Sequence, residues 1–144
     1  MIGLDGALAT AQVFEHTGGL APGDPVRATG HPLMAELGPG LVGGVFDGML
    51  RRLGGAPDVL EPGLRSPTLE PERRWDFTPS VRVGDVVEQG TILGTAPETG
   101  AITFRALVPD GVRGAVEWLA AAAPLRAHDP IARIGGVAVA LAHL

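Results

Sequence analysis

Glycine and proline make up a large share of this chain and restrict what it can fold into. The 144 residues include 22 glycines and 13 prolines, and both residue types interrupt helices and end strands. Between them, valine, leucine and isoleucine recur in short alternating runs, which is typical of strands with one buried face. The sequence therefore predicts a mostly β structure of many short strands and turns rather than a disordered chain.

The predicted strands fall into two groups on either side of a stretch that has no sustained period. Residues 54–71 are rich in proline, glycine and charge, a composition typical of a surface loop or linker. We therefore predict one domain over 1–53, a linker over 54–71 and a second domain over 72–144. The first group of strands is predicted at 7–14, 25–29 and 32–37. The second is predicted at 78–83, 86–87, 91–95, 102–108, 114–119 and 131–141.

One segment has a helical rather than a strand period. Between Leu41 and Leu53, apolar residues stand at positions 41, 42, 45, 46, 49, 50 and 53. Because this spacing places them on one face of a helix, we predict a short helix over part of the segment. A flexible or helical turn is also expected over residues 120–123, before Pro124.

Composition excludes several kinds of partner and site. The net charge of −5 argues against a nucleic-acid-binding surface. With no cysteine there is no thiolate nucleophile, thiolate metal site or disulfide, which fits the cytoplasm. No apolar run approaches the roughly 20 residues that a membrane-spanning helix needs, so we expect any membrane association to go through partners.

Two series of motifs carry a resemblance to a known family. The first series contains VFEHTGGL at 13–20, PGDPV at 22–26, TGHPL at 29–33 and ELGPGLVGGVFDG at 36–48. The second contains WDFTP at 75–79, VGDVV at 83–87, GTILGT at 90–95, PET at 97–99 and VPDGVRG at 108–114, followed by Trp118. In this order, the motifs resemble the catalytic A subunits of archaeal and vacuolar-type rotary ATPases. The second series resembles the insertion in those subunits called the bulge or non-homologous region.

The resemblance implies a fold and a set of partners. It implies a partial amino-terminal β-barrel over 1–53 and, after the linker, a small β-barrel or sandwich formed by the bulge. Such subunits are cytoplasmic, lie peripheral to the membrane, and drive proton or sodium transport or make ATP. Their bulges contact the B subunit or the peripheral stalk and help resist torque. We therefore expect a structural, non-catalytic role for this chain.

The resemblance does not extend to an ATP site. The phosphate loop of such subunits needs a lysine to reach the β- and γ-phosphates, and the chain has eleven arginines but no lysine. We expect no catalytic, cofactor-binding or metal-binding residues and no bound cofactor. The acidic residues are scattered among turns, where solvation and turn formation are their expected roles.

The second half also resembles lipoyl and biotinyl carrier domains. Its pattern VRVGDVVEQGTILG at 81–94 resembles the hairpin signature of those domains, and the lysine-bearing tip would lie near Glu98-Thr99-Gly100. Without a lysine, an amide-linked cofactor is chemically excluded, although the fold likeness remains. The alternative function is therefore a carrier-like binding or adaptor domain without cofactor.

Histidine, arginine and aromatic residues each have a functional and a structural interpretation. The histidines His16, His31, His128 and His143 are far apart, which favours surface or strand-end positions over a metal site. The pairs at 51–52 and 73–74 are arginines that could hold a phosphate or a partner's carboxylate, although a solvated or intersubunit face is more common. Trp75 and Phe77 alternate as in a strand, so they pack in the core or form a docking patch.

The amino-terminal strands carry a last expectation. The barrel of the resembled family uses strands that precede Leu4, so we expect an open strand edge at residues 7–14. Open edges recruit other chains, and a homodimer through this edge is therefore predicted.

Overall fold

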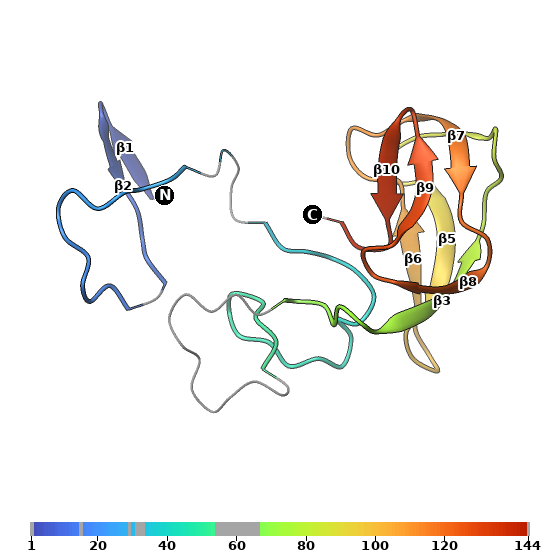
Figure 1. Cartoon of the computed structure of the whole chain (residues 1–144), viewed down its shortest axis with the longest axis horizontal. Coiled ribbons are helices and arrows are strands. Elements are labelled where there is room, and N and C mark those ends of the chain that lie inside the picture. Colours follow the sequence, from blue (N-terminus) through green and yellow to red (C-terminus); the bar gives the residue numbers. More distant parts are fainter. Residues whose placement is uncertain (1, 15, 29, 31–33, 54–66, 144) are drawn as a thin grey trace. The chain divides into compact units, whose positions relative to one another are not determined.

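The computed structural model describes residues 2–14, 16–28, 30, 34–53 and 67–143, and all regular secondary structure in them is β (Figure 1). The chain divides into two units. One contains Met1–Pro32 with Ala56–Arg65, and the other contains Leu33–Gly55 with Ser66–Leu144. The predicted boundary at 54–71 lies largely outside the described residues and stays a prediction. Within the described part, however, residues 34–53 group with residues 67–143 and not with the amino-terminal strands.

The first unit contains a single described hairpin. Strands β1 (Gly3–Asp5) and β2 (Leu8–Thr10) pair antiparallel, and Gly6 allows the turn because its φ is +56°. All side chains of both strands are exposed. The predicted strand at 7–14 is thus present only over residues 8–10. Residues 25–28 are irregular, so that strand prediction was wrong there, while Thr29 lies outside the described residues.

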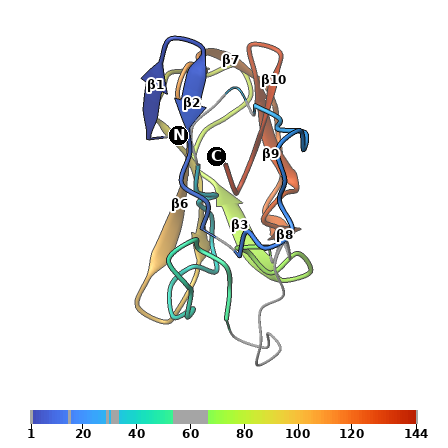
Figure 2. The ribbon, with the colours of Figure 1, turned by 90° about the vertical axis from the view of Figure 1, so that its left-hand side faces the viewer.

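The second unit is built from two four-stranded antiparallel sheets. Their strand orders are β10-β9-β7-β4 and β6-β5-β3-β8. Figures 1 and 2 show the strands of the two sheets gathered into one body. The strands are β3 (Arg74–Pro79), β4 (Val86–Val87), β5 (Ile92–Pro97), β6 (Thr103–Leu107), β7 (Gly114–Leu119), β8 (Ala123–Arg126), β9 (Pro130–Ile134) and β10 (Val137–Ala140).

Both sheets contribute side chains to one core, which makes the unit a β-sandwich. Phe77 from β3 and Leu93 from β5 pack in the same cluster as Ile131 and Ile134 from β9. Gly94 makes room for Phe77, because an added Cβ would contact that ring and would lie 2.6 Å from the carbonyl oxygen of Thr78. The predicted small barrel or sandwich is confirmed.

A second, smaller core surrounds Trp75. It contains Leu69, Ala96, Ala127 and Ala142, with Leu41 packed against it. Trp75 and Phe77 are only 3% and 1% exposed, since alternate positions of β3 point to the same side. The core interpretation of these two aromatics is therefore confirmed, and the docking patch is not.

The predicted helix between Leu41 and Leu53 was wrong. The segment instead turns back on itself, with an isolated bridge between Phe46 and Arg52. Gly43 has φ +79° and Leu50 has φ +56°, and left-handed residues cannot continue a right-handed helix. Of its apolar residues, Leu41 packs against the core around Trp75, whereas Val42 and Val45 are 46% and 66% exposed.

Three other predicted strands and one predicted turn need correction. The strand predicted at 78–83 covers residues 74–79 instead, as β3, and residues 80–83 lie outside any strand. Residues 131–141 form two strands rather than one, because Gly135 and Gly136 both have positive φ and turn the chain between β9 and β10. The expected turn at 120–123 gives way to β8, which pairs with β3 in spite of Pro124. Met34–Glu36 are irregular, and Leu37 makes only an isolated bridge. Pro32 and Leu33 lie outside the described residues.

Candidate functional site

The most extensively bonded feature outside the sheets is the segment at residues 36–53, called the junction below. It packs against the sandwich at the tip of the β5–β6 hairpin, residues 98–102, called the hairpin tip. The two are joined by contacts between residues 56 and 58 positions apart. Because both belong to the second unit, these contacts form part of its own structure.

Glu98 of the hairpin tip holds the junction through its backbone. Its Oε1 accepts hydrogen bonds from the amide of Gly40 at 2.7 Å and from the amide of Val42 at 2.9 Å. The tip is ordered for this contact, because Glu98 donates its own amide to the carbonyl of Ile102 at 2.9 Å. The hydroxyl of Thr99 accepts the amide of Ile102 at 3.1 Å.

The Gly-Pro-Gly sequence of the junction is required by close packing. Gly40 has φ +102°, and an added Cβ would lie 2.8 Å from Cζ2 of Trp75. An added Cβ on Gly38 would lie 2.7 Å from Cδ1 of Leu69. Pro39 is fully buried between them. Only glycine fits these two positions without displacing the small core around Trp75.

Arg52 holds the same turn from the other side. Its Nη2 donates to the carbonyl of Gly40 at 2.7 Å, and its Nη1 lies 3.1 Å from Oε1 of Glu70. The guanidinium also stands 5.1 Å from the ring centroid of Phe46, within cation–π range. The amide and the carbonyl of Gly40 are thus both bonded to charged side chains, which fixes the turn.

The other arginines of the two pairs also have partners within the chain. Arg73 stands 5.3 Å above the ring of Trp75 and 3.8 Å from Glu70. Arg74 donates to the carbonyl of Pro124 at 3.2 Å. Arg51 pairs with Asp47 at 2.6 Å. These contacts give the pairs at 51–52 and 73–74 an internal, structural role, which neither of the sequence interpretations anticipated.

Asp47 organises the turn that closes the junction. Its carboxylate accepts the amides of Met49 and Arg51 at 2.9 and 2.8 Å. The hydrogen bond from the Arg51 amide is the main reason why the pKa of Asp47 lies below its ordinary value, and desolvation opposes it. The Arg51 guanidinium and the Met49 amide lower the pKa further.

The histidines occupy surface and segment-end positions. His128 contacts Oε1 of Glu36 through Nε2 at 2.5 Å, and His143 exchanges two backbone hydrogen bonds of 2.9 Å with Leu37. His16 is exposed, and His31 lies outside the described residues. These contacts attach the start of the junction to the turn between β8 and β9, through His128, and to the end of the last described segment, through His143.

Metal-ligand clusters and membrane-spanning helices are both absent from the described residues. No group of three or more histidine or acidic side chains in them could hold a metal ion. In the same residues, no helix is long and apolar enough to cross a membrane. What the junction and hairpin tip can do chemically is bind and position backbone, which is a structural activity.

The hairpin tip also bears on the comparison with carrier domains. At the tip, where a carrier would present its lysine, this chain has Glu98 bonded to the junction. Sequence reasoning placed Glu98 in the PET motif but assigned it no role. No local signal could have done so, because its partners, Gly40 and Val42, are more than fifty residues away.

Comparison with known proteins relates both parts of the chain to ATP synthases. Residues 66–140 match the family described as the ATPsynthase alpha/beta subunit barrel-sandwich domain. Residues 1–30 match the β-barrel domain of the ATP synthase alpha/beta family. The junction lies between the two matched ranges.

Individual relatives are much longer ATP synthase chains. The A subunit of the A-type ATP synthase of Methanopyrus kandleri is 43% identical over 138 residues, which are 93% of this chain and 23% of the relative. The corresponding subunit of Metallosphaera sedula is 42% identical, over 90% of this chain and 23% of the relative. The V-type ATP synthase alpha chain of Streptococcus sanguinis is 49% identical, over 74% and 19%. The chain therefore spans less than a quarter of these relatives.

Proposed function

This chain belongs to the family of ATP synthase alpha/beta subunit barrel-sandwich domains, and from that membership we propose that it forms a non-catalytic, structural part of the A subunit of an archaeal or vacuolar-type rotary ATPase. Its work is to keep the barrel-sandwich unit in a fixed position on the subunit. The ATP-driven transport of protons or sodium, or the synthesis of ATP, belongs to the complete subunit within its complex.

One observation carries the proposal. Glu98 of the sandwich accepts the amides of Gly40 and Val42, so the sandwich holds the segment that joins it to the preceding part of the chain. Arg52, within that segment, bonds to the carbonyl of Gly40 and fixes the same turn. Hydrogen bonds of this kind transmit force, because a displacement of the sandwich pulls directly on the backbone of the junction. Hydrogen bonds from charged groups to backbone are among the stronger ones in proteins, as the resistance to torque in this proposal requires.

The proposed partners are the other subunits of the complex. A domain held on a fixed base presents its outer surface at a constant position, which suits contacts with the B subunit or the peripheral stalk. We place the chain in the cytoplasm, peripheral to the membrane and without direct contact with it or with nucleic acid. The adaptor alternative has less support, because the hairpin tip that a carrier uses is engaged by Gly40 and Val42.

A chimera tests the proposal. The corresponding segment of the Streptococcus sanguinis alpha chain is replaced by this chain, and the product is expressed with the other subunits of that complex. We expect the chimera to co-purify with them and to hydrolyse Mg-ATP, while this chain alone neither binds nor hydrolyses the nucleotide. Hydrolysis by the isolated chain, or a folded chimera that fails to join the complex, contradicts the proposal.

A further inference from the structure

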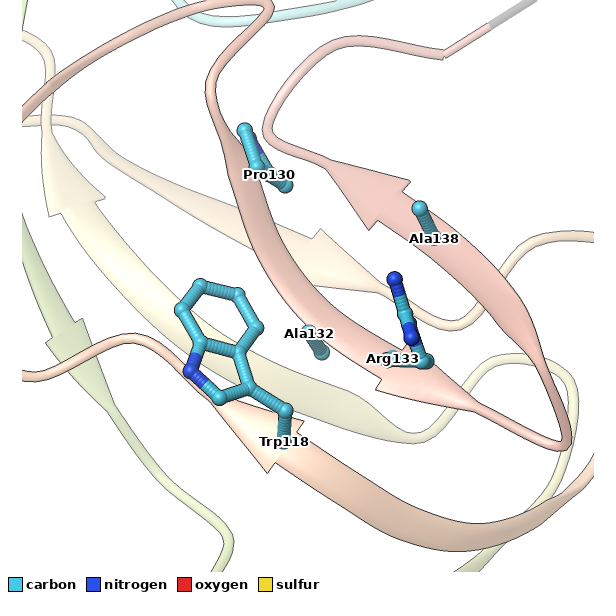
Figure 3. A pocket seen from close by; sticks show the side chains of 5 residues that line it. All are labelled: Trp118, Pro130, Ala132, Arg133 and Ala138. Atoms are coloured by element: carbon cyan, nitrogen blue, oxygen red, sulfur yellow. The ribbon is translucent and has the colours of Figure 1, made fainter.

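One face of the sheet β10-β9-β7 carries an open apolar groove (Figure 3). Its volume is about 420 Å³, and Trp118, Pro130, Ala132, Arg133 and Ala138 line it. These five residues define the Trp118 groove. Trp118 is 46% exposed, whereas the other tryptophan, Trp75, is 3% exposed. An indole left half in water calls for an explanation, since tryptophan gains most from burial.

A local irregularity in β7 turns this indole outward. The register of β7 against β9 shifts between Val116 and Trp118, so that Val116 is buried while Glu117 and Trp118 are both exposed. Bulges of this kind redirect a side chain and occur where function requires it. Glu117 supports the arrangement by accepting the amide of Gly136 at 3.0 Å, which fixes the turn between β9 and β10.

The surroundings of Trp118 leave space beside its ring. Ala138 on β10 is exposed and has a short side chain (Figure 3), whereas Ala132 on β9, which also lines the groove, is 1% exposed and belongs to the core. Pro130 is at the start of β9, on the same side. The groove can therefore take up an apolar side chain of a partner against the indole.

Arg133 gives the groove a charge. It is the one ionisable residue of the lining, it pairs across the strands with Trp118, and it is exposed. Within the part of the chain that the structure describes, no carboxylate forms an ion pair with it. The groove is thus positive in a chain whose net charge is −5. Its charge complement is a carboxylate, which a guanidinium binds with two parallel hydrogen bonds.

We propose that the Trp118 groove is a docking site for a partner segment in which an apolar side chain stands next to an acidic one. The apolar side chain packs on the indole beside the exposed Pro130 and Ala138, and the acidic one pairs with Arg133. Tryptophan and arginine are the residue types that contribute most to protein interfaces. The inference rests on the proposed function, for which it names a contact surface and the chemistry of the partner.

The test uses three capped tetrapeptides as probes: acetyl-Leu-Glu-Leu-Glu-amide, acetyl-Leu-Gln-Leu-Gln-amide and acetyl-Leu-Lys-Leu-Lys-amide. Each is titrated into the 144-residue chain, and the indole N–H signal of Trp118 is followed by NMR, with the signal of Trp75 as internal reference. We expect saturable shifts of the Trp118 signal, with the acidic peptide binding at least ten-fold more tightly than the basic one. Equal affinity for the three peptides, or no binding of any, overturns the proposal.

Variants separate the two parts of the site. Arg133→Glu should reverse the charge preference, and Trp118→Phe should weaken the binding of every peptide several-fold, followed then by the amide signal of Ala132. Arg82→Glu removes an exposed arginine outside the lining and should change nothing. If Arg133→Glu keeps the preference for the acidic peptide, the proposal is wrong.

Co-purification of the chimera with the other subunits distinguishes a failure of this inference from a failure of the proposed function. If the chimera with Arg133→Glu joins the complex as well as the unmodified chimera and the peptides do not bind, the inference fails and the proposed function stands. If the unmodified chimera does not join the complex while the peptides bind at Trp118, the proposed function fails and the groove remains a binding site.

Discussion

Replacing Glu98 by alanine should loosen the junction without unfolding the sandwich. The substitution removes the acceptor of two hydrogen bonds, those from the amides of Gly40 and Val42. Gly40 is buried, and leaving a buried donor without an acceptor costs about 1–3 kcal/mol. Val42 is 46% exposed, so its amide can bond to water and loses about 0.5–1 kcal/mol. The two losses together amount to about 1.5–4 kcal/mol.

Hydrogen exchange measures this loss at the residues concerned. A cost of about 1.5–4 kcal/mol corresponds to roughly 10- to 900-fold faster exchange of the Gly40 and Val42 amides if they exchange by local opening. Amides of the main core, such as that of Ile131, should keep their protection because Glu98 does not contact that core. The measurement is residue-resolved exchange by NMR on the wild-type chain and the variant.

Two further variants calibrate the result. Glu98→Gln keeps a carbonyl acceptor but loses the charge, which about halves the strength of such a bond, so its effect should fall between wild type and alanine. Glu88→Ala removes an exposed carboxylate of a loop and should leave both amides unchanged. If the Gly40 and Val42 amides exchange less than two-fold faster in a folded Glu98→Ala chain, the carboxylate of Glu98 does not hold the junction.

Three other predictions test the core, the junction turn and the amino-terminal hairpin. Gly94→Ala forces a Cβ against the Phe77 ring and close to a backbone carbonyl, so it should destabilise the folded chain by about 1–3 kcal/mol. Calorimetry should show a lower midpoint of thermal unfolding. An unchanged midpoint would refute the close packing of Gly94 against Phe77. Because the pKa of Asp47 is lowered in the folded chain, its charged carboxylate stabilises the turn above the unfolded pKa of about 4, and the turn should loosen as the pH falls below that value. An NMR pH titration should show this as movement of the Arg51 amide signal. A signal that does not move as the carboxylate titrates argues against this contact. Val13 follows β2, whose edge is open, and is 55% exposed. Val13→Glu should therefore weaken the predicted dimer, which ultracentrifugation detects as a mass that rises with concentration. A chain that is monomeric at high concentration excludes this dimer.

Local patterns were sufficient to predict the sandwich. Alternation at Trp75 and Phe77 indicated a strand with one buried face, although the strand predicted at 78–83 covers residues 74–79 in the structure. This signal works because a strand with one buried face must alternate, whatever its partner. The sequence could not show how the strands divide between two sheets, because that depends on contacts between residues far apart.

The junction shows where local reasoning fails. Its apolar spacing fits a helix, but the left-handed residues at 43 and 50 and the packing of Gly40 against Trp75 impose a series of turns. The role of Glu98 follows only from the folded structure, since its carboxylate completes a segment 56 to 58 positions earlier. Tertiary contacts thus decided both the conformation and the candidate site.

Native mass spectrometry of the chain mixed with its proposed partners is the sharpest test of the structural role. The 144-residue chain is combined with separately purified peripheral-stalk subunits and the B subunit of a related V-type complex, with and without Mg-ATP. We expect a defined complex that contains the chain together with one or more of these subunits, and no nucleotide bound to the chain itself. A chain that stays unbound to every partner, or that retains Mg-ATP on its own, contradicts the structural role.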